Sequence, residues 1–214
     1  MLGNLIRQLV SGLKPGDPSV PPSVQRRSGS WHHADLTWLA RSVLDVPGDF
    51  AEIGVFRGAA FRKVAALAYS QSRMAHAFDS FRGMAPPQSA GDATYPAGKF
   101  DVGGPQAFMK IMDEAGVSRD MYRVWPGYIP ECFRDVPDSV RFAFAILDVD
   151  HYQPTVDGLA WLAPRMNPGA ILALDDYIES FATLASQAIK EFLAANPGFD
   201  TVAQFNQQLI LRKR

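Results

Sequence analysis

The stretch Phe142-Ala-Phe-Ala-Ile-Leu-Asp-Val-Asp150 reads as a buried strand that ends in carboxylates, and it decides the fold class. A second stretch, Ala170-Ile-Leu-Ala-Leu-Asp-Asp-Tyr177, repeats the pattern. Short, continuous apolar runs are typical of parallel strands that are covered on both faces. Ligands of open α/β sheets bind beyond the carboxyl ends of the strands, so we expect the acidic residues to converge on one site. These residues are Asp148, Asp150, Asp175 and Asp176. Because an unpaired buried charge is costly, a hard divalent cation is their natural common partner.

Further apolar segments alternate with these two runs and are separated by glycine and proline. Such alternation predicts an α/β fold with a doubly wound parallel sheet. Two C-terminal runs, 201–205 and 208–211, are separated by Asn206-Gln207 and predict an antiparallel β-hairpin. The other expected strands are 49–53, 74–78 and 121–125, and the expected helices are 31–44, 59–72, 105–115, 155–166 and 180–195.

The first 30 residues are expected to lie outside the main domain. Apolar residues recur at helical spacing between Leu2 and Leu13, which predicts an amphipathic helix. A proline-rich linker follows at residues 15–30. We therefore predict an N-terminal helix and linker at 1–30 and a single domain at 31–214. The helix would dock on its own domain or on a second subunit, giving a homodimer, and reversible attachment to a membrane surface is the alternative.

Composition narrows the range of partners. The formal net charge of −1 gives no reason to expect nucleic acid. Cys132 is the only cysteine, so there is no disulfide framework and a reducing compartment is compatible. No apolar run is long enough to span a bilayer, and the N-terminal pattern differs from a secretory signal. We expect a cytoplasmic protein without stable membrane insertion.

A glycine-containing turn joins the first strand to its helix and suggests a cofactor site. Glycines at this position let a ligand approach the backbone, although a plain tight turn explains Gly54 and Gly58 equally well. Asp79 follows the second strand, where an acidic residue can accept hydrogen bonds from a ribose. A helix cap or turn is the alternative role. Residues 82–104 form a connection long enough to be an active-site lid.

Taken together, the ordered motifs resemble the macrocin O-methyltransferase family. They are Pro47-Gly48-Asp49, Glu52-x-Gly54-Val55-x-x-Gly58, Asp79-Ser80-Phe81-x-Gly83, Pro126-Gly127, Leu147-Asp148-x-Asp150-x-Tyr152-x-x-Thr155, Pro168-Gly169 and Asp175-Asp176-Tyr177. The resemblance implies the seven-stranded sheet of S-adenosylmethionine-dependent methyltransferases, with its C-terminal hairpin. It also implies a metal-dependent enzyme that methylates sugar hydroxyls of natural products.

Carried over by position, the resemblance assigns two groups of site residues. The residues implied to bind S-adenosylmethionine are Glu52, Gly54 and Gly58 at its methionine end, Asp79 at the ribose, and Ser80 and Phe81 near the adenine. The residues implied to bind Mg²⁺ are Asp148, Asp175 and Asp176. Asp150 would lie outside this ligand set and either orient one of its members or cap the following turn.

The sequence offers two candidates for the general base. His151 stands three residues after Asp148, where catechol-type O-methyltransferases carry a lysine, whereas the macrocin family usually has an apolar residue here. Histidine titrates near neutral pH and could take the proton of the acceptor hydroxyl. A metal-bound aspartate such as Asp148 could do the same, with His151 packing beside the site.

We therefore expect an S-adenosylmethionine- and Mg²⁺-dependent O-methyltransferase that acts on a small hydroxylated acceptor, a sugar of a natural product or glycan. A catechol-type phenol is an alternative acceptor. A nicotinamide-dependent oxidoreductase is disfavoured because the glycine fingerprint G-x-G-x-x-G is incomplete. A non-catalytic nucleotide-binding module on the same fold is disfavoured because a degenerate site has no reason to keep the acidic motifs.

Overall fold

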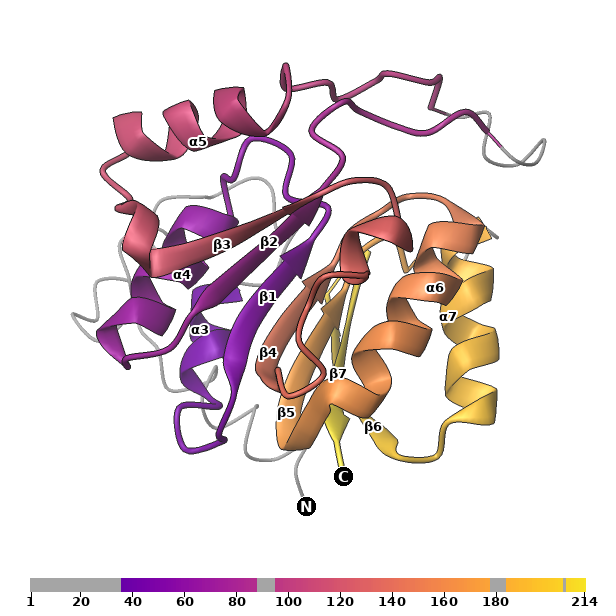
Figure 1. The fold of residues 1–214 in the computed structure, drawn as a ribbon. Coiled ribbons are helices and arrows are strands. Elements are labelled where there is room, and N and C mark those ends of the chain that lie inside the picture. The colour runs from indigo at the N-terminus through magenta and orange to yellow at the C-terminus, as the bar shows by residue number, and fades with distance from the viewer. Residues whose placement is uncertain (1–35, 88–94, 178–183, 206) are drawn as a thin grey trace, which may run out of the picture.

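Seven strands form one mixed sheet in the order β3-β2-β1-β4-β5-β7-β6 (Figure 1). The computed structural model describes residues 36–87, 95–177, 184–205 and 207–214. The predicted N-terminal helix, the linker and the proposed dimer contact at 1–30 lie outside these residues. The strands are β1 Asp49–Ile53, β2 Ala75–Asp79, β3 Tyr122–Pro126, β4 Phe142–Leu147, β5 Met166–Leu174, β6 Phe199–Phe205 and β7 Gln208–Lys213.

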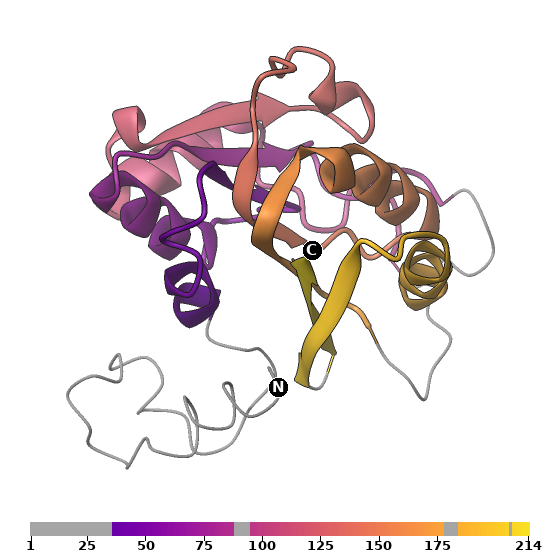
Figure 2. The same cartoon turned by 90° about the horizontal axis from the view of Figure 1, so that it is seen from below.

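Strands β1 to β5 are parallel, β7 is antiparallel to β5, and β6 is antiparallel to β7. This topology confirms the predicted doubly wound sheet and its C-terminal hairpin. Helices α3 and α4 cover one face, while α6 and α7 cover the other (Figure 2). The helices are α3 Leu36–Arg41, α4 Phe61–Ser70, α5 Pro105–Glu114, α6 Tyr152–Leu162 and α7 Leu184–Ala195. Among the described residues, no helix combines the length and apolar character needed to cross a membrane.

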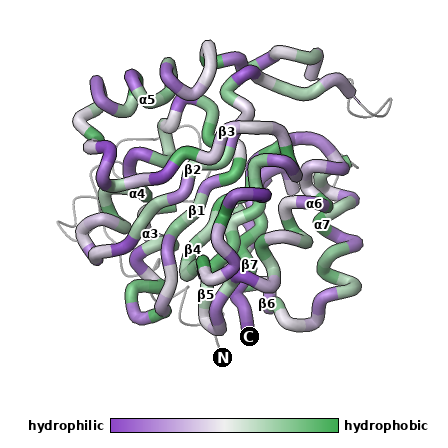
Figure 3. The backbone as a smooth tube through the Cα atoms, viewed as in Figure 1, coloured by the Kyte–Doolittle hydropathy of each residue, from purple (hydrophilic) through white to green (hydrophobic). Residues whose placement is uncertain are grey.

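The centre of the sheet is the most apolar part of the molecule (Figure 3). Every residue of β4 is buried, with no exposed fraction above 3%. Phe50 of β1 and Phe144 of β4 pack edge to face across neighbouring strands, with ring centroids 5.7 Å apart. The continuous apolar run therefore forms the central strand that its composition predicts.

Strand β5 begins earlier than the sequence predicts. The segment Asn167-Pro168-Gly169 reads as a turn, yet it belongs to the strand Met166–Leu174. Its pairing with β4 is irregular here, because Phe142 pairs with Met166 and Phe144 already pairs with Ile171. Proline lacks a backbone N–H and is tolerated in a strand at such an irregularity.

A buried histidine links the three strands at one end of the sheet. His76 of β2 is 3% exposed, and its Nδ1 accepts a hydrogen bond from the indole N–H of Trp125 in β3 at 3.0 Å. Because an indole nitrogen can only donate, the imidazole proton must lie on Nε2. Nε2 then donates to Asp49 Oδ2 in β1 at 3.1 Å. The chain Trp125–His76–Asp49 thus gives both nitrogens of the buried imidazole a hydrogen-bond partner.

Trp125→Phe tests this chain of hydrogen bonds. The variant leaves His76 Nδ1 buried without a donor, so we expect the free energy of unfolding to fall by about 1–3 kcal/mol. The measurement is urea denaturation followed by circular dichroism. The control is Trp161→Phe, which shortens a tryptophan that stacks on Phe133 with ring centroids 4.2 Å apart. Equal losses in both variants would show that ring size alone matters.

Candidate active site

Acidic side chains from the ends of β4 and β5 meet at the carboxyl edge of the sheet. Carboxylate oxygens of Asp148, Asp150 and Asp176 all lie within 4.8 Å of one another. The strand ends are aligned by backbone hydrogen bonds, since Asp148 N–H donates to Ile53 O at 2.9 Å and Asp175 N–H donates to Leu147 O at 2.9 Å. An all-oxygen donor set of this kind suits Mg²⁺.

The geometry differs in one respect from the ligand set implied by the sequence. Asp150, expected outside the set, belongs to the group of three, and Asp175, expected within it, does not. Asp150 and Asp176 both adopt the left-handed conformation, with φ of 60°. Non-glycine residues seldom take this conformation, and it clusters at functional sites. Sequence periodicity carries no signal for such a local turn.

Negative charge accumulates in this group. The pKa of Asp148 lies well above its usual range because of burial and, after that, the charges of Asp175, Asp150, Asp176 and Glu52. The pKa of Asp150 rises to about 7, chiefly through burial and then through Asp176. Carboxylates that raise one another's pKa values in this way are strongly attracted to a cation.

A second acidic pair lies beside this group on β1 and β2. Glu52 is 5% exposed, and its pKa is well above the usual value because of burial and then the charge of Asp79. Within the described part of the chain, Glu52 Oε2 is buried without a hydrogen-bond partner. A buried polar atom in this state calls for an explanation, and the ammonium of a bound ligand would provide one.

Asp79 fixes two turns at once. Its Oδ2 accepts the backbone N–H of Phe56 at 2.8 Å, and its Oδ1 accepts that of Phe81 at 2.7 Å. These two hydrogen bonds support the alternative role of Asp79 as a turn residue. Each carboxylate oxygen has further acceptor capacity, so the same side chain can still receive ribose hydroxyls.

The other residues predicted to bind the cofactor have clear packing roles. A Cβ on Gly54 would lie 1.6 Å from the carbonyl oxygen of Asp148, and a Cβ on Gly58 would lie 2.9 Å from Met112 Sδ. Ser80 Oγ donates to Gly83 O at 2.8 Å. The Phe81 ring is fully buried and stacks on Phe108 with centroids 4.7 Å apart. Their cofactor roles stay predictions.

His151 lies at the N-cap of α6, directly after the acidic motif. Its carbonyl oxygen accepts from Thr155 Oγ1 at 2.7 Å. The imidazole is 4% exposed, and its Nε2 has no hydrogen-bond partner among the described residues. A buried ring nitrogen without a partner in the described part of the chain is compatible with a base, and that role stays a prediction.

Sequence reasoning missed side chains in the connection between β2 and α5. Its two described ends run antiparallel, since Met84 N–H donates to Lys99 O at 2.8 Å and Gly98 N–H donates to Met84 O at 2.9 Å. The charge of Lys99 lowers the pKa of Asp150, and the charge of Asp150 raises that of Tyr95. The connection therefore brings Tyr95 and Lys99 to the acidic group, which its low apolar content did not reveal.

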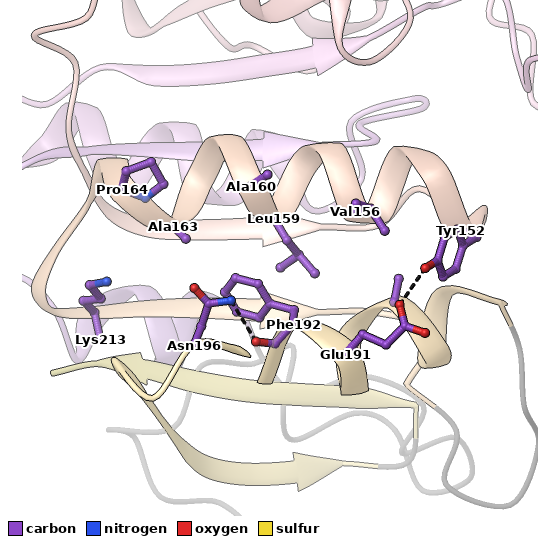
Figure 4. A pocket seen from close by; sticks show the side chains of 11 residues that line it. Tyr152, Val156, Leu159, Ala160, Ala163, Pro164, Glu191, Phe192, Asn196 and Lys213 are labelled. Atoms are coloured by element: carbon purple, nitrogen blue, oxygen red, sulfur yellow. Dashed lines mark hydrogen bonds between the residues drawn. The ribbon is translucent and has the colours of Figure 1, made fainter. Parts of the chain in front are cut away.

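A groove of about 550 Å³ lies elsewhere, between α6 and α7 (Figure 4). Its walls are mainly apolar, with Leu159 and Phe192 facing one another across it. Tyr152 donates a hydrogen bond to Glu191 at 2.6 Å at one end, and Lys213 lies at the other. None of the four aspartates lines this groove, so it is separate from the candidate site.

Comparison with known proteins gives a consistent result. The chain is 29% identical over 156 residues to the 8-demethyl-8-(2,3-dimethoxy-alpha-L-rhamnosyl)-tetracenomycin-C 4'-O-methyltransferase of Streptomyces olivaceus, covering 67% of this chain and 59% of that protein. It is 27% identical over 180 residues to the mycinamicin III 3''-O-methyltransferase of Micromonospora griseorubida, covering 79% of this chain and 69% of that one. The chain thus spans less than two thirds of the length of the first relative.

Solved structures share the fold. The O-methyltransferase NovP superposes with a TM-score of 0.70 at 22% identity, covering 84% of this chain and 78% of its own. The calicheamicin methyltransferase CalS11 superposes with a TM-score of 0.68 at 25% identity, covering 83% and 76%. A family model described as macrocin O-methyltransferase matches residues 32–206, and this match shows that the chain belongs to the macrocin O-methyltransferase family.

Proposed function

We propose that the chain is an S-adenosylmethionine- and Mg²⁺-dependent O-methyltransferase that acts on a sugar hydroxyl of a small acceptor. The observation that carries this proposal is the group formed by Asp148, Asp150 and Asp176 at the carboxyl edge of the sheet. Family membership gives the type of reaction. The two curated relatives are named for methylating a tetracenomycin and a mycinamicin, which supports a glycosylated natural product as acceptor.

Cofactor and metal occupy neighbouring places in this proposal. Glu52 would hold the ammonium of S-adenosylmethionine and Asp79 its ribose hydroxyls. Asp148, Asp150 and Asp176 would hold Mg²⁺, with Asp175 close enough to Asp148 to raise its pKa. A bound divalent cation would orient two neighbouring acceptor oxygens and make the attacking hydroxyl more acidic.

The protein's own contribution is positioning and proton transfer. Methyl transfer from a sulfonium is an in-line displacement, so catalysis depends mainly on holding the acceptor oxygen against the methyl group. The proton of the acceptor hydroxyl must pass to a nearby base. We propose His151 or a metal-bound aspartate, Asp148, for this role, because His151 lies three residues after Asp148 and its imidazole Nε2 is buried without a hydrogen-bond partner among the described residues.

The metal set can be tested residue by residue with Mn²⁺ as a spectroscopic substitute for Mg²⁺. Removing one carboxylate charge by Asp148→Asn, Asp150→Asn or Asp176→Asn should weaken Mn²⁺ binding by about 10-fold or more. Asp175→Asn should have a smaller effect, and the exposed Asp135→Asn should have none. Electron paramagnetic resonance of free Mn²⁺ gives the affinities. A larger loss in Asp175→Asn than in Asp150→Asn would restore the ligand set implied by the sequence.

The raised pKa of Asp150 predicts that the stability of the metal-free protein depends on pH. The carboxyl titrates near 3.9 when unfolded and at about 7 when folded, so protonation favours the folded state. This stabilisation is complete below pH 4 and is lost as the pH rises through 7. In EDTA, Asp150→Asn should therefore raise the melting temperature at pH 8 by about 2–4 °C for each 1 kcal/mol relieved, and change it little at pH 4.5.

The same linkage makes Mg²⁺ a pH-dependent stabiliser. Protons compete with the cation for the carboxylates, so added Mg²⁺ should raise the melting temperature of the wild-type protein more at pH 8 than at pH 5.5. Differential scanning calorimetry at both pH values measures this. Equal stabilisation at the two pH values would place the cation away from the raised carboxyls.

Asp79→Asn tests the cofactor assignment. The change keeps the size of the side chain but removes its charge, so S-adenosylhomocysteine should bind more weakly by about 1–3 kcal/mol. Calorimetric titration gives the affinity. The melting temperature reports any loss of stability from weakening the two hydrogen bonds that Asp79 accepts from backbone N–H groups. Unchanged affinity would place the ribose elsewhere.

A further inference from the structure

Three aromatic rings form a row at the carboxyl edge of the sheet. Phe100 contacts Phe56 on one side, with centroids 5.4 Å apart and planes at 70°. It contacts Tyr95 on the other side, also with centroids 5.4 Å apart and planes at 63°. Phe56 and Phe100 are 40% and 38% exposed. Neighbouring large apolar side chains left open to solvent often mark a place where a ligand binds.

The row reaches from one proposed half-site to the other. At one end, the backbone N–H of Phe56 donates to Asp79, the residue proposed to hold the ribose. At the other end, the charge of Asp150 raises the pKa of Tyr95, with smaller contributions from burial, Asp176 and Asp148. The row therefore lies along the edge that an acceptor would occupy if it reached from the proposed cofactor site to the proposed metal site.

Lys99 adds a positive charge to the row. Its ammonium lies 4.2 Å from the centre of the Tyr95 ring and 5.1 Å from that of Phe100. Such cation–π contacts hold the Lys99 side chain in place, and they do not require its three N–H groups to donate hydrogen bonds to a carboxylate. The backbone of Lys99 is held as well, because its carbonyl oxygen accepts a hydrogen bond from the N–H of Met84 at 2.8 Å. The ammonium is thus held at a defined position beside the acidic group.

We propose that Phe56, Tyr95, Lys99 and Phe100 form the acceptor subsite, in which a sugar places its C–H groups against the rings and its oxygens on the ammonium. The proposal rests on the function proposed above and identifies the residues that select the acceptor. Lys99 is a positioning residue in this subsite, since it orients the acceptor through oxygens other than the reacting one.

The chemistry of the row favours a sugar over a flat phenol. Aromatic faces carry partial negative charge and attract the C–H groups of a pyranose, which carry partial positive charge. An ammonium has donors only, so it requires an acceptor oxygen, and a sugar offers several around its ring.

Binding of two probes, methyl α-L-rhamnopyranoside and catechol, tests the subsite in the presence of S-adenosylhomocysteine and Mg²⁺. Saturation-transfer NMR titrations compare wild-type protein with Phe100→Ala and Lys99→Met. The controls are Tyr69→Ala, an exposed aromatic on α4, and Lys110→Met, an exposed lysine on α5. We expect sugar affinity to fall about 2- to 12-fold in Phe100→Ala and about 10-fold or more in Lys99→Met. The controls should match wild type, and S-adenosylhomocysteine affinity should be unchanged in all variants.

The outcomes separate this inference from the proposed function. Normal S-adenosylhomocysteine binding with equal sugar affinity in all variants overturns the subsite and leaves the methyltransferase proposal standing. The subsite is also overturned if wild-type protein binds no sugar. It is overturned as well if wild-type protein binds catechol more tightly than the sugar and the variants lose affinity for catechol. Failure of wild-type protein to bind S-adenosylhomocysteine overturns the proposed function itself, and the acceptor subsite with it.

Discussion

The close approach of the Asp148 carbonyl to Gly54 is the constraint on which the candidate site depends. At this point β1 and β4 continue their pairing past the ends of the strands, with Asp148 N–H donating to Ile53 O at 2.9 Å. A side chain at position 54 would lie 1.6 Å from the carbonyl oxygen and would force the two chains apart. Because the strands stay together here, the carboxylates after β4 and β5 come within reach of the acidic pair on β1 and β2.

Much of this arrangement could be predicted from the sequence, because it follows from continuous apolar runs and the turns between them. The run 142–147 predicts a central parallel strand, and parallel strands bring their terminal aspartates to one edge. The membership of the group of three could not be predicted in this way. It depends on φ values of 60° at Asp150 and Asp176, and periodicity does not encode a single left-handed residue.

The position of Tyr95 and Lys99 beside the acidic group could not be predicted from the sequence for a different reason. They lie in a long connection with no apolar period, and their position is set by backbone pairing between residues 84 and 98–99. A propensity argument treats such a segment as a loop and assigns no contacts to it. Their meeting with Asp150 is a tertiary effect, and it supplies positive charge where four neighbouring aspartates supply negative charge.

The strand order of the C-terminal hairpin has a consequence for how the chain is made. β7 is the last strand in sequence, yet it lies inside the sheet, between β5 and β6. The edge of β5 therefore stays unpaired during synthesis until residues 208–213 have left the ribosome. Exposed edges recruit other strands. The half of the sheet that carries Asp175 and Asp176 is thus the last to have its open edge covered, and until then it can pair with other strands and aggregate.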